Sequence, residues 1–272
     1  VPDPTNFEAI SVLPIHCVFW RRSSESWIRH RNPLVDVRLG VTLDLICVDT
    51  LHTLALGVYH RFVPVAIYAL LDANVYKLPE MFSNVEKHEL GLQKMDRELD
   101  DFYKQYAAAH RDDPLSEIGL LNSGTVGAHN DPKLHAKAAE TEGLLGFVQT
   151  LLVRHKGSLP NGDMWCGAGD SLVLCKTLIK SMPMRPSVGQ QQALWGAVQR
   201  FVACSNILEL HLTPKHHLWV HMCDRIRIGG SPKYGATWND ESLNNDIKKR
   251  FVRAHSINAE ARVLLEWLKQ AP

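Results

Sequence analysis

The chain changes character at Asp49, where one apolar segment ends and a longer one begins. Residues 41–48 are dominated by Val, Leu and Ile without clean alternation, which is typical of a strand covered on both faces. Thr50 can then cap a mostly apolar helix over residues 51–72. An acid at the carboxyl end of a buried strand lies where open α/β sheets bind ligands. The pattern predicts a binding edge at Asp49, with a helix cap or an ordinary loop acid as the alternative.

The rest of the chain is predicted to be helical, with loops at 111–130 and 157–169. Apolar spacing and Pro or Gly breaks predict these helices: 84–110, 132–155 with Asp131-Pro132 at its first turn, 170–181, 187–209, 214–228, 239–253 and 257–269. The expected fold is therefore α/β. Its core would comprise residues 41–72 and 210–272, interrupted by a helical insertion at 73–209 and preceded by an irregular segment at 1–40.

Composition narrows the class of protein without identifying it. The 272 residues are 45% hydrophobic and 22% charged, as in soluble globular proteins, and the net charge of +1 leaves any basic surface local. Six cysteines without a CxxC pair favour free thiols in a reducing compartment. The apolar stretch at 63–71 is too short for a bilayer, and Val1-Pro-Asp-Pro resembles neither a signal peptide nor a natural start. We expect an intracellular protein without a membrane partner, and further sequence upstream.

Glu241 is the second candidate acid. It lies beside Asp240 in the first turn of the predicted helix 239–253, a position that the helix dipole alone favours. Asn244, one turn further on, could orient the carboxylate or contact phosphate. If the fold brought Asp49 and Glu241 together, their carboxylates could serve a two-magnesium phosphoryl-transfer site, at a separation of roughly 4–8 Å.

Histidines accompany both acidic segments. His52 follows Asp49 by three residues and can hydrogen-bond to it, although a satisfied core histidine is the alternative. His217 and His221 have the i, i+4 spacing of zinc ligands, with His211 or Cys223 as a possible third ligand. The competing interpretation is a helix that packs its histidines and tryptophan against a core.

Basic residues cluster in two places. Lys248, Lys249, Arg250 and Arg253 follow Glu241 and, together with Arg225, Arg227 and Lys233, could follow a phosphate backbone. A solvated helix face is the alternative. Near the start of the chain, Arg21, Arg22, Arg29 and Arg31 are interleaved with Trp20 and Trp27.

The two acidic segments together resemble DDE-type transposases with a ribonuclease H-like fold, in particular the CACTA-type and related eukaryotic groups. Asp49-Thr-Leu-His52-Thr-Leu-Ala-Leu56-Gly57 is similar to the family's Asp-x-x-His-x-x-x-Leu-Gly segment, which carries the second catalytic acid. The later segment keeps the family's order, with Pro214-Lys215-His216-His217, His221, Gly229-Gly230, and Glu241 followed by Asn244. The resemblance covers about 41–72 and 213–258.

The resemblance implies a partial ribonuclease H-like core that cleaves and joins DNA. Two Mg²⁺ or Mn²⁺ ions would be held by three carboxylates, with Asp49 as the second and Glu241 as the third. His52 would orient Asp49, and Asn244 would act similarly beside Glu241. Lys215 and the basic residues of 248–253 would hold the DNA backbone. Element ends and target DNA are the implied partners, with a homo-oligomer and a nuclear location.

One departure from the family concerns its first catalytic Asp. Asp3 and Asp36 lie in irregular, Pro-rich sequence, so neither fits the first strand of such a fold. We therefore expect these residues alone to be catalytically inactive, either because earlier strands precede Val1 or because the copy has decayed. Two other hypotheses stay open: a non-enzymatic helical relic that binds nucleic acid or protein through the Arg21–Arg31 patch, and a His/Cys zinc protein.

Overall fold

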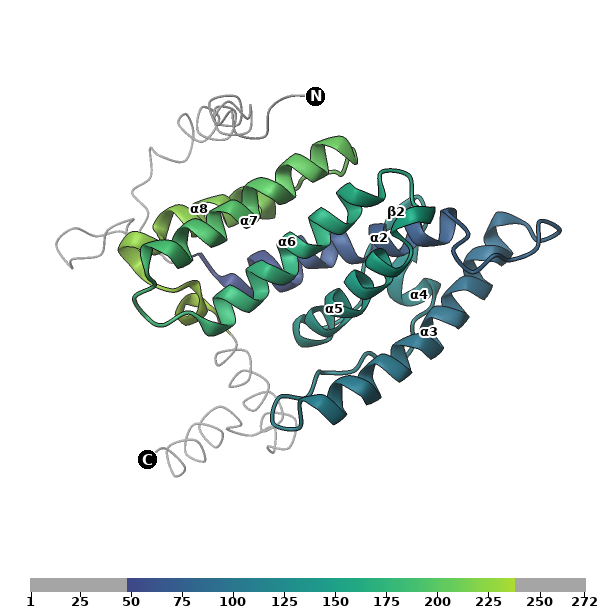
Figure 1. Cartoon of the computed structure of the whole chain (residues 1–272), viewed down its shortest axis with the longest axis horizontal. Helices are drawn as coiled ribbons and strands as arrows, with labels where there is room; N and C mark the ends of the chain where they lie inside the picture. The colour runs from purple at the N-terminus through teal and green to yellow at the C-terminus, as the bar shows by residue number, and fades with distance from the viewer. Residues whose placement is uncertain (1–47, 238–272) are drawn as a thin grey trace, which may run out of the picture. The chain divides into compact units, whose positions relative to one another are not determined.

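A computed structural model describes residues 48–237, shown in colour in Figure 1. This part of the chain is mostly helical, with one two-stranded antiparallel sheet. The predicted strand at 41–48 lies outside the described residues except for Val48, which is not in a strand. The irregular segment 1–40 and the predicted helices 239–253 and 257–269 also lie outside them. The ribonuclease H-like sheet therefore stays a prediction.

A long helix at residues 51–72 forms the centre of the fold, as predicted. It begins as the π-helix η4 (Leu51–Tyr59) and continues as the α-helix α2 (His60–Asp72). Pro64 lies inside α2 and removes one backbone hydrogen bond there. By length and composition this 22-residue helix could cross a membrane, but 72% of its most apolar window is buried inside the protein. A core helix of a soluble protein passes the same test, and here the helix is part of the core.

Helices and short elements follow in chain order after α2. They are α3 (Asn84–Ala109), α4 (Ser123–Val126), β1 (Gly127–Ala128), β2 (Asp131–Pro132), α5 (Ala138–Arg154), η5 (Lys156–Ser158), α6 (Gly162–Ser181), α7 (Val188–Ile207), α8 (Pro214–Gly229) and η6 (Pro232–Gly235). The helices predicted at 84–110, 187–209 and 214–228 are thus confirmed as α3, α7 and α8. Capping boxes begin α3 and α7, where Ser83 pairs with Glu86 and Ser187 with Gln190.

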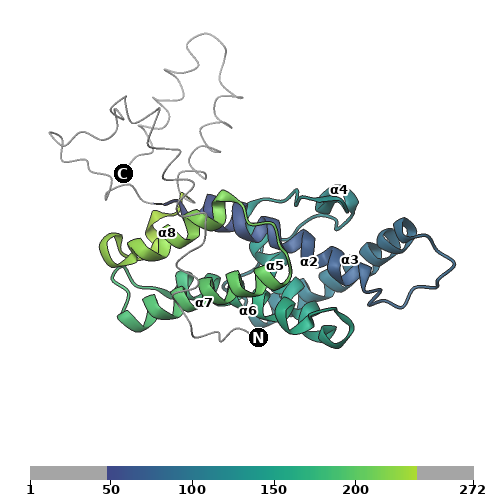
Figure 2. The ribbon, with the colours of Figure 1, turned by 90° about the horizontal axis from the view of Figure 1, so that it is seen from above.

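The helices make a series of contacts around helix 51–72 that starts and ends at η4. α5 contacts both η4 and α2, α6 packs between α5 and α7, and α7 contacts α8, which returns to η4 (Figures 1 and 2). α3 contacts α2 instead. The first half of helix 51–72 is therefore covered by α8 and the second half by α3.

Aromatic side chains fill the space between these helices. The Phe62 ring lies 6.1 Å from the rings of Trp165 and Phe201, and Phe201 lies 5.5 Å from Trp219. Each such side chain contributes roughly 1.5–3 kcal/mol by burial. The described cysteines, Cys166, Cys175, Cys204 and Cys223, are all buried free thiols, which confirms the free-thiol prediction for these four.

The helix predicted over 132–155 begins later than expected. Asp131–Pro132 forms β2 and pairs with Gly127–Ala128, so the Asp-Pro pair belongs to a hairpin and does not cap a helix. Gly127 has a φ of +79°, and a Cβ there would lie 2.6 Å from the Lys133 nitrogen. The hairpin therefore requires glycine at this position. α5 begins only at Ala138.

The loop predicted over 157–169 is wrong for most of its length, because α6 begins at Gly162. Its glycines permit close helix packing: a Cβ at Gly169 would lie 1.7 Å from the Gln149 side-chain oxygen on α5. The sequence pattern of clustered glycines indicated a loop, whereas here it marks the tight contact between α5 and α6.

Candidate functional site

Asp49 lies immediately before helix 51–72 and accepts hydrogen bonds on both carboxylate oxygens. Oδ1 accepts from the Leu51 N–H at 3.0 Å and from the Thr237 N–H at 3.1 Å. Oδ2 accepts from the Thr237 hydroxyl at 2.8 Å and from His52 Nδ1. The predicted contact between His52 and Asp49 is confirmed. The Thr237 bonds join residues 188 positions apart in the chain.

These hydrogen bonds favour the ionised carboxylate. Partial burial by itself would raise the pKa of Asp49, but the hydrogen bonds from His52, Thr237 and Leu51 outweigh it and lower that pKa below its usual value. A carboxylate offers about four acceptor positions, and four donors occupy them here. Its oxygens are the ligands that Mg²⁺ prefers, but an ion would have to replace the Thr237 hydroxyl or the His52 N–H at Oδ2.

α8 packs against η4, the first half of helix 51–72, so the described parts of the two segments that carry the resemblance lie against each other. The Thr50 hydroxyl donates to the Pro232 carbonyl at 2.6 Å. A Cβ at Gly57 would lie 2.9 Å from the His52 carbonyl oxygen and 3.0 Å from Lys215 Cβ. Gly57 therefore packs closely against the stem of Lys215.

A cavity of about 320 Å³ opens beside Asp49. Thr50 and Leu51, the residues that follow Asp49, line it together with these charged side chains: Glu142, Lys176, Lys180 and Lys233. Lys176 Nζ donates to the Glu142 carbonyl oxygen at 2.9 Å. Burial raises the pKa of Glu142 and lowers that of Lys176, so both charged forms lack part of their hydration. An anion in this cavity would stabilise the Lys176 ammonium.

The histidines of α8 have different surroundings. His216 is buried, accepts a hydrogen bond from the Thr213 N–H at 3.0 Å, and stacks on Phe201 with ring centroids 5.7 Å apart. Burial lowers the pKa of His216 to about 4. His217 and His221 approach each other at 2.8 Å between their Nε2 atoms. The predicted packing of a histidine and Trp219 against the core is confirmed.

A third ligand for the predicted zinc pair is not found within residues 48–237, since neither His211 nor Cys223 joins His217 and His221 in a cluster of three ligand atoms. Glu241, Asn244, Lys248, Lys249, Arg250 and Arg253 lie outside the described residues, as does the patch from Arg21 to Arg31. Their predicted roles stay predictions.

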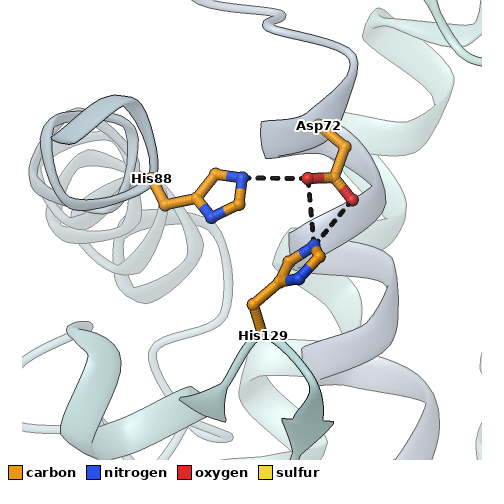
Figure 3. Close-up of side chains that lie close together, drawn as sticks. All are labelled: Asp72, His88 and His129. Carbon is orange, nitrogen blue, oxygen red and sulfur yellow. Dashed lines mark hydrogen bonds and ion pairs between the residues drawn. The ribbon is translucent and has the colours of Figure 1, made fainter. Parts of the chain in front are cut away.

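Sequence reasoning missed a cluster at the other end of helix 51–72, drawn in Figure 3. Asp72, the last residue of α2, accepts from His88 Nε2 at 2.9 Å and from His129 Nε2 at 3.0 Å. His88 comes from α3, and His129 from the turn between β1 and β2. Each residue is isolated in the sequence, so no spacing pattern could have revealed the cluster.

Comparison of the chain with protein-family models, with curated proteins and with solved structures finds no match in any of the three. The transposase resemblance therefore depends on the residues quoted for it and on the contacts between their segments.

Proposed function

We propose that Asp49 and the segment from Pro214 to Glu241 belong to a DDE-type phosphodiester-cleaving and strand-transfer domain with a ribonuclease H-like core. The observation that carries the proposal is the hydrogen bonding of Thr237 to Asp49. Segments that the family keeps far apart in sequence are side by side in this fold.

Chain length supports the pairing of the two acids. Glu241 follows Thr237 by four residues, and four residues reach at most about 14 Å. Because Thr237 contacts the Asp49 carboxylate directly, covalent geometry permits the proposed approach of Glu241 to that carboxylate. Such a reach is compatible with the roughly 4–8 Å expected between carboxylates that share a two-metal site.

The chain's own residues would position the reactants. Asp49 supplies a carboxylate that is held ionised, and His52 fixes its orientation. Two divalent ions, when bound, supply activation of the attacking oxygen and stabilisation of the leaving oxygen. The lysine-lined cavity beside Thr50 offers cationic contacts for phosphate groups of a DNA strand. Lys215, with its stem on Gly57, is a further proposed backbone contact.

The test locates a divalent ion in the full chain by replacing Mg²⁺ with Fe²⁺ in the presence of ascorbate and peroxide. Hydroxyl radicals then cut the backbone next to the ion. We expect cuts around residues 49 and 241 together, suppressed by excess Mg²⁺. Asp49→Asn and Glu241→Gln should each remove both cuts, because the two acids share the ions.

Asp240→Asn is the matched control, since it changes the neighbouring acid and should leave both cuts intact. Cuts near 49 that persist in Glu241→Gln would separate the two acids and contradict the proposal. No cut at either position would leave the non-enzymatic binding domain as the better explanation.

DNA binding by the cavity is tested separately. Lys233→Ala should weaken binding of a DNA duplex and lower the slope of log affinity against log salt by about 0.9 for one lost phosphate contact. Lys77→Ala, a change on a lysine away from the cavity lining, should leave both quantities unchanged. Equal effects of the two variants would exclude a specific role for the cavity.

A further inference from the structure

We propose that Asp72, His88 and His129 bind a Zn²⁺ ion that fastens α3 and the β1–β2 hairpin to the end of α2. The cluster lies at the opposite end of helix 51–72 from Asp49, and none of its residues belongs to the proposed DNA-processing site. Among the described residues, it is the one group of three His, Cys, Asp or Glu side chains whose ligand atoms converge.

The distances suit a small divalent cation. His88 Nε2 lies 2.9 Å from Asp72 Oδ1, His129 Nε2 lies 3.0 Å from Oδ2, and the three ligand atoms all fall within 4.8 Å of one another. Ligands at about 2.0–2.1 Å from a tetrahedral zinc ion are roughly 3.3 Å apart. An ion therefore fits if each histidine nitrogen moves a few tenths of an ångström from the Asp72 carboxylate and the two nitrogens, within 4.8 Å of each other, settle at about 3.3 Å. Figure 3 shows both imidazoles directed at the same carboxylate.

The charge at this position calls for a cation. Asp72 is the last residue of α2, where the helix dipole disfavours a negative charge, and the last turn contains no basic residue. The His88 and His129 rings stack with centroids 4.9 Å apart, so both lie beside the same carboxylate. A metal ion supplies the positive charge while both imidazoles stay neutral, which is the form that binds metals.

Tyr68 holds the ligands in place. It precedes Asp72 by one turn on the same helix face, and its ring meets the His88 and His129 rings at centroid distances of 5.6 and 5.0 Å. Its hydroxyl donates to the Gly127 carbonyl at 2.6 Å, which anchors the hairpin that carries His129. Such supporting contacts orient metal ligands before the ion arrives.

The ligand set and its exposure identify the ion. Two imidazole nitrogens with one carboxylate favour Zn²⁺ over Mg²⁺. The Asp72 and His129 side chains are 51% and 52% exposed, which leaves solvent access for water as a fourth ligand. The ion would cross-link residues 57 positions apart, so its effect is structural.

Calorimetric titration of the full chain with Zn²⁺, in excess Mg²⁺, tests the proposal. We expect an ion to bind with an affinity that His129→Gln lowers at least about 100-fold, since even supporting residues of metal sites change affinity 10–100-fold. The Gln amide still donates to Asp72 but is a poor zinc ligand. At zinc concentrations 100-fold above Kd, the wild-type Tm should rise by about 5–10 °C, and this rise should vanish in His129→Gln.

A double variant, His217→Gln with His221→Gln, is the matched control and should retain the Asp72-site affinity. Loss of zinc binding in this control, with retention in His129→Gln, would place the ion on α8 and overturn the proposal, as would the absence of binding. Co²⁺ provides a readout that needs no variant: visible bands of a nitrogen- and oxygen-ligated ion are expected. A thiolate charge-transfer band would indicate a cysteine site and contradict the proposal.

Discussion

The two ends of helix 51–72 each hold a carboxylate, in opposite electrostatic settings. Asp49 precedes the first turn, where the helix dipole and the Leu51 N–H favour negative charge. Asp72 closes the last turn, where the dipole opposes it, and its partners are imidazoles from other segments.

The two carboxylates also differ in their sequence context and in how their hydrogen bonds are completed. Asp49 belongs to a recognisable sequence segment, yet its hydrogen bonds are complete within the chain. Asp72 belongs to no motif, but the helix dipole opposes its charge and it is bonded to two imidazoles. We therefore expect the Asp49 carboxylate to stabilise the fold without an ion, and the Asp72 carboxylate to contribute fully only with the proposed one.

The largest effect is expected at α8, which covers the Asp49 half of the helix. The pKa of His216 is about 4 in the folded protein, because burial disfavours the charged ring, against an ordinary value of 6.5. Between these values the unfolded chain binds the additional proton, so stability falls as pH decreases from 6.5 to 4, by about 3 kcal/mol. Urea unfolding at pH 7, 6, 5 and 4 measures this loss.

His216→Gln is the control for that loss, since glutamine keeps the capping box with Thr213 and does not titrate. Between pH 6.5 and 4, the free energy of unfolding of His216→Gln should change much less than that of the wild type. An equally steep loss in His216→Gln would assign the acid sensitivity to other groups.

The comparison of the two acids is tested by Asp49→Asn and Asp72→Asn, measured by urea unfolding without metal ions. Asp49→Asn should cost about 1–2 kcal/mol, because it removes the negative charge that the helix dipole favours and places an amide N–H₂ against donor groups. Asp72→Asn should change stability by less than about 0.5 kcal/mol, because relief of the dipole offsets the weakened hydrogen bonds. Equal losses of stability in Asp49→Asn and Asp72→Asn would contradict the expected difference between the two ends.

The sequence predicted the helices better than their contacts. Apolar spacing with Pro and Gly breaks was sufficient for helix 51–72, α3, α7 and α8. The predicted Thr50 cap is wrong, because the Thr50 hydroxyl donates to the Pro232 carbonyl and makes no cap bond. The glycines of α6 misled because local propensity favours a loop, whereas the tight packing of Gly169 on Gln149 decides the structure. Local pattern cannot report such a tertiary contact.

For the candidate sites, the sequence predicted the contact of His52 with Asp49, because the two residues are three positions apart. The contacts of Thr50 with Pro232 and of Gly57 with Lys215 bring the two segments together, while the meeting of Asp49 with Glu241 stays a prediction. His88 and His129 lie 16 and 57 positions from Asp72. Only folding brings them together, so no spacing rule could find them.

A smaller difference in stability is expected between glycine substitutions near the two ends of helix 51–72. Gly57→Ala should cost about 1–2 kcal/mol, because the new Cβ meets a backbone oxygen and the stem of Lys215, neither of which can move easily. Gly91→Ala on α3 meets only the Leu71 Cδ2 methyl group, at 2.4 Å, which can rotate. The gain in helix propensity of about 1 kcal/mol should make this change nearly neutral. Thermal unfolding of both variants checks the order, and a larger loss for Gly91→Ala would contradict it.

The smallest expected effect is the loss of stability at low pH that comes from protonation of Asp49. It is best measured in the His216→Gln background, where the larger contribution of His216 is absent. The pKa of Asp49 is lowered in the folded protein, so its contribution to stability is present above its ordinary value of 3.8 and is lost as pH falls through the lower folded value. The stability difference between Asp49 and Asp49→Asn should therefore be constant from pH 6 to 5 and narrow below pH 4. Thr237→Val removes the hydroxyl donor to Oδ2, so it should reduce the size of that narrowing and complete it at a higher pH. If Thr237→Val leaves this pH dependence unchanged, the hydrogen bond between the two distant segments does not keep the Asp49 carboxylate ionised. The contacts within its own helix would then be sufficient to lower its pKa.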